Sequence, residues 1–99
     1  MIVHIHEDAR ITLDEADTFT AFHVKALERS PQAVADLLGN GAYADAGGNV
    51  WIPIARLHEL GRIHGGAEWR AGCDGMIAFA DSKGWVDADT RAVRAHIED

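Results

Sequence analysis

The sequence predicts a helix-rich α+β domain of about five helices and a small two- to three-stranded sheet. Apolar residues recur at helical spacing in several segments that Gly, Pro and Asx residues separate. A glycine-rich loop between two short segments near 42–52 indicates a β-hairpin within that sheet. A length of 99 residues and a hydrophobic content of 47% suffice for one compact domain, 1–99, with its own core.

The chain is expected to begin with a strand and a turn. Apolar and polar side chains alternate over residues 2–6, so His4 and His6 share one face of the strand. Polar residues 7–10 then turn the chain.

A first helix is predicted from about Asp14 to the Ser30–Pro31 step. Thr12 and Glu15 have the spacing of a capping box, and acidic residues suit the positive end of the helix dipole. An apolar stripe at helical spacing supports this helix and comprises Phe19, Phe22 and Ala26.

A second helix is predicted from Pro31 to Leu38. Ser30 is a good N-cap, proline fits the first helical position, and Gly39 suits the C-terminal end. The expected buried residues of this helix are Val34, Leu37 and Leu38.

The hairpin near 42–52 is predicted to turn at residues 46–48. If Asp45 pairs with Asn49, Tyr43 faces Trp51 across the two strands.

Three further helices are predicted. A short one begins at Pro53 and ends at Gly61, a longer one follows Gly65–Gly66 and runs to about Lys83, and the last begins at Asp87. The long helix contains two glycines that each cost roughly 1 kcal/mol relative to Ala, which indicates close approach of another backbone. These glycines are Gly72 and Gly75.

The charge balance argues against several classes of partner. Sixteen acidic residues against nine Lys and Arg give a formal charge of −7, and the cations are scattered singly. A phosphate backbone or an anionic membrane surface requires clustered cations, so neither nucleic acid nor membrane is an expected partner.

The only cysteine, Cys73, lies on the apolar stripe of the long helix, so we expect a buried thiol and not a nucleophile. One cysteine cannot form an internal disulfide, which suits a reducing compartment. The N-terminal residues show no signal-peptide pattern, and a cytoplasmic location is the expectation.

Six histidines suggest a metal site. Two imidazoles on one side of a strand lie about 6.5–7 Å apart along it and can share a zinc ion if further ligands arrive. The predicted set is His4, His6, His58 and His64, with zinc or another transition metal as the ion. Carboxylate donors for this set are Glu7, Asp8 or Glu59. The competing interpretation places the first two histidines on the solvent side of an edge strand, and no cofactor is favoured.

The leading functional hypothesis is a small acidic binding or interaction module that forms a homo-oligomer or binds a protein or small molecule. No catalytic constellation is assembled in the sequence, which favours a protein that is not an enzyme. Tyr43 and Trp51 are the expected partner or ligand surface, on one small sheet with the His4 and His6 face. The alternative is a small metal protein or enzyme that uses the histidine set.

A second alternative is a winged-helix-like regulator without a basic surface. The predicted order of helix, helix and hairpin is that of a winged helix. However, neither the second helix, 31–38, nor the hairpin contains a Lys or Arg to contact DNA.

Overall fold

The computed structural model describes residues 1–98 and contains two separate sheets. The N-terminal sheet has the order β2 (Ile11–Asp14), β1 (Ile2–Ile5), β3 (His23–Lys25). Strands β1 and β2 are antiparallel, whereas β1 and β3 are parallel, with Val3 opposite both Leu13 and Val24. Because strand side chains alternate, this register directs Val3 and Val24 into the core and His4 to the opposite face.

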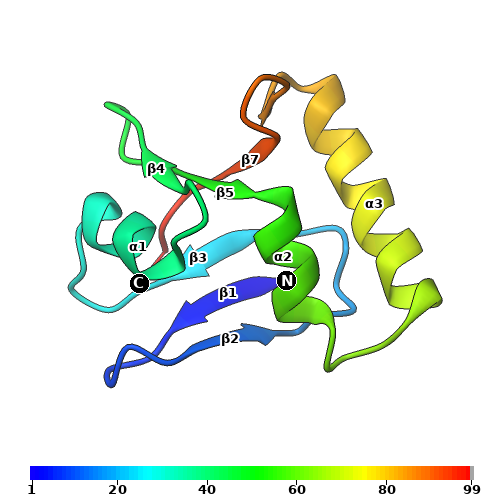
Figure 1. The fold of residues 1–99 in the computed structure, drawn as a ribbon, viewed down its shortest axis with the longest axis horizontal. Coiled ribbons are helices and arrows are strands. Elements are labelled where there is room, and N and C mark those ends of the chain that lie inside the picture. The colour runs from blue at the N-terminus through cyan, green and yellow to red at the C-terminus, as the bar shows by residue number, and fades with distance from the viewer. Residues whose placement is uncertain (99) are drawn as a thin grey trace.

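The C-terminal sheet is antiparallel throughout. Its order is β4 (Tyr43–Ala44), β5 (Val50–Pro53), β7 (Ala92–Ala95), β6 (Val86–Asp87). An isolated parallel bridge joins Val24 of β3 to Ile97, which follows β7 in the chain. In Figure 1 the two sheets lie one above the other, with β5 and β7 over β3 and β1.

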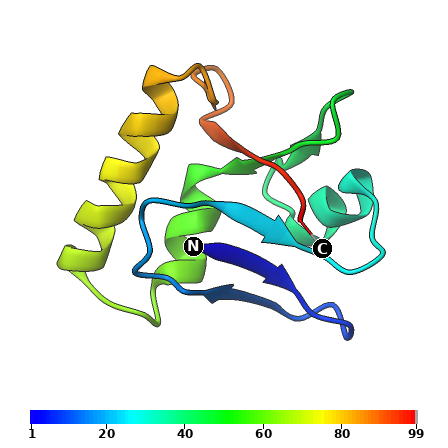
Figure 2. The ribbon, with the colours of Figure 1, turned by 180° about the vertical axis from the view of Figure 1, so that it is seen from behind.

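Three helices in the described chain complete the fold: α1 (Pro31–Leu38), α2 (Ile54–Gly61) and α3 (Ala67–Ser82). Helix α1 packs on β4 and β5, and α2 contacts β2, β5 and α3. Helix α3 runs along one side of the molecule and contacts β6 and β7 (Figure 1). From behind, no helix covers the face of β1, β2 and β3 that is turned toward the viewer (Figure 2).

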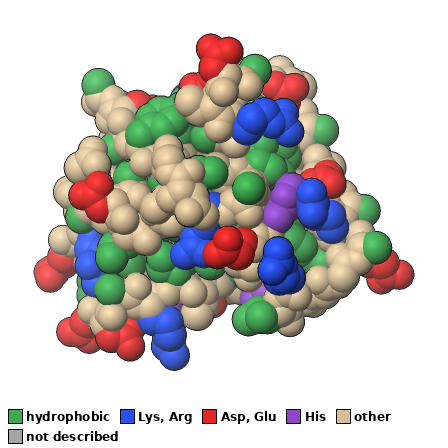
Figure 3. All heavy atoms as spheres, viewed as in Figure 1, with side chains coloured by type: hydrophobic (Ala, Val, Ile, Leu, Met, Phe, Trp, Pro, Cys, Tyr) green, Lys and Arg blue, Asp and Glu red, His purple; other side chains and the backbone are tan. Residues whose placement is uncertain are grey.

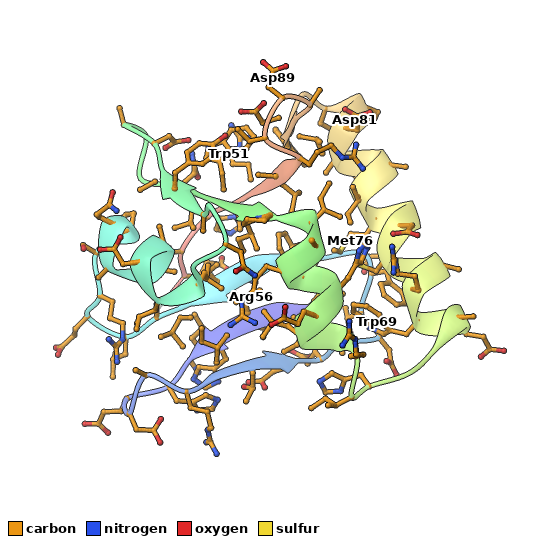
Figure 4. All side chains as sticks on the ribbon, viewed as in Figure 1. Trp51, Arg56, Trp69, Met76, Asp81 and Asp89 are labelled. Atoms are coloured by element: carbon orange, nitrogen blue, oxygen red, sulfur yellow. The ribbon has the colours of Figure 1, made fainter. Side chains whose placement is uncertain are left out.

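A single hydrophobic cluster holds these elements together. The N-terminal sheet contributes its inward residues, α1 contributes Val34, Ala35 and Leu38, and α2 contributes Leu57. From α3, the buried residues are Trp69, Cys73, Met76 and Ala80, and Figure 4 shows Trp69 and Met76 on the side of α3 that faces α2. The molecule is therefore a compact α+β globule with two sheets around one core.

The predictions for the middle of the chain are confirmed. Helix α1 begins after an N-cap in which Ser30 Oγ accepts the backbone N–H of Ala33 at 3.1 Å, and Gly39 follows its last residue with a positive φ. The hairpin has the predicted register, because Tyr43 lies opposite Trp51. Helices α2 and α3 occupy the expected ranges.

The helix predicted from about Asp14 to the Ser30–Pro31 step is wrong. Asp14 ends strand β2, Glu15 has a positive φ of 48°, and the chain then forms a loop that leads into β3. The Thr12–Glu15 spacing is therefore no capping box, and Thr12 pairs with His4 across β1 and β2. Strand β3 forms its backbone hydrogen bonds with β1. This pairing determines the structure of the segment, although Phe19 and Phe22 have a spacing typical of a helix.

The helix predicted after Asp87 is also wrong, because β6 and β7 form a hairpin there. Asp87 accepts the backbone N–H of Asp89 and of Thr90 within the turn, so it orders a turn and does not cap a helix. Two of the five predicted helices are replaced by strands, and the sheets hold three and four strands. The helix, helix, hairpin order of a winged helix is consequently not formed.

Candidate functional site

His4 and His6 form a polar cluster with two residues of the neighbouring strand β2. The imidazole rings stack with their centroids 3.8 Å apart and an interplanar angle of 25°. His4 Nδ1 lies 2.7 Å from Asp14 Oδ2, and His6 Nε2 lies 2.6 Å from Thr12 Oγ1. Thr12 Oγ1 in turn donates to Asp14 Oδ1 at 2.9 Å. These contacts join four side chains across β1 and β2 on the face away from the core.

The carboxylate of Asp14 is kept ionised by this cluster. Partial burial raises the pKa of Asp14, but the hydrogen bonds from His4 and Thr12 and the nearby imidazoles outweigh it. The net effect is a pKa below the ordinary value of an aspartate. The cluster therefore presents an anionic oxygen beside two imidazoles at neutral pH.

The structure does not bring the four predicted histidine ligands together. Within residues 1–98, the group of potential ligands whose donor atoms lie within 4.8 Å of one another is His4, His6 and Asp14. His58 lies on α2, where its Nε2 contacts Asp74 Oδ1 at 2.9 Å and links α2 to α3. His64 is exposed in the segment between these helices.

Asp14 is the site residue that sequence reasoning missed. A helix was predicted from Asp14 onward, so strand β2 was not recognised. Thr12 and Asp14 are nevertheless two residues apart, as His4 and His6 are, which is the spacing of side chains on one face of a strand. A hairpin turning at residues 7–10 would have placed both pairs on one face.

The predicted surface residues Tyr43 and Trp51 are half-buried and stack with ring centroids 5.9 Å apart. The Tyr43 hydroxyl donates to Asp87 Oδ2 at 2.7 Å, and Trp51 Nε1 donates to Asp45 Oδ2 at 2.9 Å. Both polar atoms are thus engaged within the chain. The expectation that they share a sheet with His4 and His6 is wrong, because Tyr43 and Trp51 belong to the C-terminal sheet.

An apolar groove of about 670 Å³ lies between α3, the loop before β3 and the C-terminal sheet. Phe79 of α3 is 59% exposed at this groove, an unusual exposure for so large an apolar side chain. The other large apolar residues that line it are Phe19, Phe22, Met76, Trp85 and Val93. The polar lining residues are Thr20, Asn49, Arg94 and His96.

Two glycines shape the α3 wall of the groove differently. At Gly72 an added Cβ would overlap the ring of Phe19, so the predicted close approach of another backbone is wrong, and a side chain fills this space instead. At Gly75 an added Cβ would meet no atom within 4 Å. The groove beside Gly75 is therefore open, and a larger side chain at residue 75 would extend into it.

Cys73 lies in the core, as predicted. Its side chain is fully buried, and burial, with a smaller effect from the charge of Asp74, raises the pKa of the thiol to about 11. A thiol of this kind is protonated at neutral pH and is a poor nucleophile.

Comparisons with protein-family models, with curated proteins and with solved structures find no match to this chain. None of the helices in residues 1–98 combines the length and the apolar character that a membrane span requires. Acidic and basic side chains are interspersed over the face shown in Figure 3.

Proposed function

We propose that this protein is a small binding module whose ligand lies in the groove beside α3 and consists of an apolar body with one anionic group. The observation that carries this proposal is the composition of the groove: an apolar wall of aromatic side chains with a cation at its edge. Ligand sites in proteins are concave, mostly apolar, and contain a few polar groups that orient the ligand. A groove of about 670 Å³ lies within the usual range for such sites.

The apolar wall supports the first half of the ligand description. Phe79 and Trp85 meet edge to face, with ring centroids 6.4 Å apart and an interplanar angle of 71°. Covering the exposed part of Phe79 with an apolar ligand would stabilise the complex by about 25 cal/mol for each Å² removed from water. The open space at Gly75 gives such a ligand room against the helix backbone.

Arg94, which lines the groove, is the evidence for an anionic group on the ligand. Its guanidinium carbon lies 5.3 Å from the centre of the Trp85 ring, which holds the cation at the groove. No carboxylate within residues 1–98 forms an ion pair with this guanidinium. An arginine can bind a carboxylate through two parallel hydrogen bonds, so Arg94 is the residue that we assign to the anionic group.

The experiment uses anilinonaphthalenesulfonate, an aromatic anion whose fluorescence rises in apolar sites, and competes it with decanoate or decanol. We expect binding of the dye and its displacement by decanoate at lower concentration than by decanol, which lacks the charge. Arg94→Gln should remove the preference for decanoate and leave the affinity for decanol unchanged.

A blocking variant and a matched control locate the site. Gly75→Leu places a side chain in open space within the groove and should weaken dye binding at least about tenfold, since it fills the apolar cavity. Ala78→Leu places the same side chain at an exposed position of α3 outside the groove and should leave binding unchanged. Equal dye binding in the wild type and Gly75→Leu would contradict the proposal.

A second copy of the chain is the competing occupant of this groove. In that case light scattering would show a dimer for the wild type and a monomer for Gly75→Leu, with no dye binding to the dimer. That result would replace the ligand by a homo-oligomeric interface.

A further inference from the structure

We propose that His4, His6 and Asp14 form a binding site for a divalent transition-metal ion such as Zn²⁺. This site is independent of the groove, because it lies on the outer face of the N-terminal sheet. Two imidazoles and one carboxylate are a common protein ligand set for zinc, and water completes the coordination.

The donor atoms of His4, His6 and Asp14 lie close enough together that small side-chain rotations would let all three residues bind one metal ion. One donor atom from each residue lies within 4.8 Å of the other two. In a tetrahedral zinc site with bonds of about 2.0–2.1 Å, donor atoms lie about 3.3 Å apart. His4 Nδ1 and Asp14 Oδ2, at 2.7 Å, are now joined by a proton. A metal ion takes the place of that proton and releases it to solvent.

Thr12 orients two of the three ligands without being one. Its hydroxyl has a single hydrogen, which it donates to Asp14 Oδ1. The contact of 2.6 Å with His6 Nε2 therefore has the imidazole N–H as its donor. An imidazole ligates a metal ion in its neutral form, through the ring nitrogen that carries no proton. Hydrogen bonds of this kind fix ring orientation in known metal sites.

The position of the cluster suits an ion that arrives from water. The side chain of His4 is 25% exposed and that of Asp14 is 43% exposed. None of the helices in the described chain covers this face of β1, β2 and β3 (Figure 2). The nearby cations are Lys25, the register partner of His4, and Arg29, which donates to the carbonyl oxygens of His6 and Glu7. With a formal charge of −7, the chain as a whole still attracts a cation.

The test is calorimetric titration of untagged, metal-free protein with ZnCl₂. We expect one equivalent of zinc to bind to the wild type. His4→Gln/His6→Gln should abolish this binding, and Asp14→Asn should weaken it at least about tenfold. His58→Gln/His64→Gln removes the same number of imidazoles from other places and should bind zinc as the wild type does. No zinc binding to the wild type, or its loss in His58→Gln/His64→Gln alone, would overturn the proposal.

A measurement on the wild type avoids any effect of the substitutions on folding. Cu²⁺ broadens the nuclear magnetic resonance signals of nearby amides and binds nitrogen ligands more strongly than Zn²⁺. The signals of β1 and β2 should broaden first at substoichiometric Cu²⁺. Selective broadening at α2 or α3 instead would place the metal elsewhere. Gly75→Leu should bind zinc normally, so the two proposals fail separately.

Discussion

The indole ring of Trp69 occupies the space that a side chain at residue 61 would need. A Cβ added to Gly61, at the C-terminal end of α2, would overlap three atoms of that ring. The same indole donates its N–H to the carbonyl oxygen of Ala16 at 3.0 Å. Trp69 therefore joins α3 to α2 and to the loop before β3, and its position depends on a glycine in α2.

Gly61→Ala should destabilise the protein by about 1–3 kcal/mol, because the buried indole must move. This loss should exceed the gain of roughly 1 kcal/mol that alanine offers in a helix. Urea unfolding at pH 7 measures the difference in free energy. Equal stability of the variant and the wild type would show that displacing Trp69 costs no more than the roughly 1 kcal/mol that alanine gains in the helix.

Gly75→Ala is the matched comparison and should have the opposite sign. This glycine also lies within a helix, but an added Cβ meets no atom within 4 Å. We therefore expect a gain of up to about 1 kcal/mol from helix propensity alone. A loss of stability here would indicate that the groove wall is tighter than the contacts suggest.

Local signals predicted the elements that local contacts determine. The Ser30 cap, the proline after it and Gly39 define α1, and the spacing of Asp45 and Asn49 defines the hairpin register. Each of these features depends on residues less than ten positions apart. Sequence patterns therefore suffice for them.

The segments for which the prediction was wrong form strands that pair with residues distant in the sequence. Strand β3 pairs with β1 about twenty residues away, and β7 pairs with β5 so that Val50 lies opposite Ala95. Apolar residues at intervals of three and four in these segments resemble a helix, and only the pairing partner decides otherwise. The same error explains why Asp14 was not predicted as a metal ligand. Asp14 lies beside His4 only because residues 11–14 form strand β2 and pair with β1.

Cys73 should react with a thiol reagent only after the protein opens. The thiol is fully buried, and its pKa of about 11 leaves about one thiol in a thousand ionised at pH 8. We expect slow reaction with dithiobisnitrobenzoate in buffer and rapid reaction of one thiol per chain in concentrated urea. Complete rapid labelling of the native protein would contradict the buried position of Cys73.

Asp45 should stabilise the hairpin in a pH-dependent way. Its carboxylate accepts the backbone N–H of Asn49 and the indole N–H of Trp51, and these bonds hold the pKa of Asp45 below its ordinary value. Since the folded pKa is lowered, the stabilisation is present above the unfolded pKa of about 3.9 and is lost as pH falls through the folded pKa.

Asp45→Ala should therefore lower the urea midpoint at pH 7, and the difference from the wild type should shrink as the pH falls below 4. Asp89→Asn, at an exposed carboxylate in the turn between β6 and β7, is the control and should give little change at either pH (Figure 4). A difference for Asp45→Ala that stays constant with pH would assign its effect to packing and not to the charge.

Ser30→Ala should destabilise the protein by about 1 kcal/mol through helix α1. The serine oxygen accepts the backbone N–H of Ala33, a donor that has no partner within the first turn of the helix. Ser30→Asp restores an acceptor and adds a negative charge at the positive end of the helix dipole, so its stability should equal or exceed that of the wild type. Because α1 packs on β4 and β5, loss of the cap should appear in the global unfolding transition measured by circular dichroism. A stable Ser30→Ala variant would mean that tertiary packing alone fixes the start of α1.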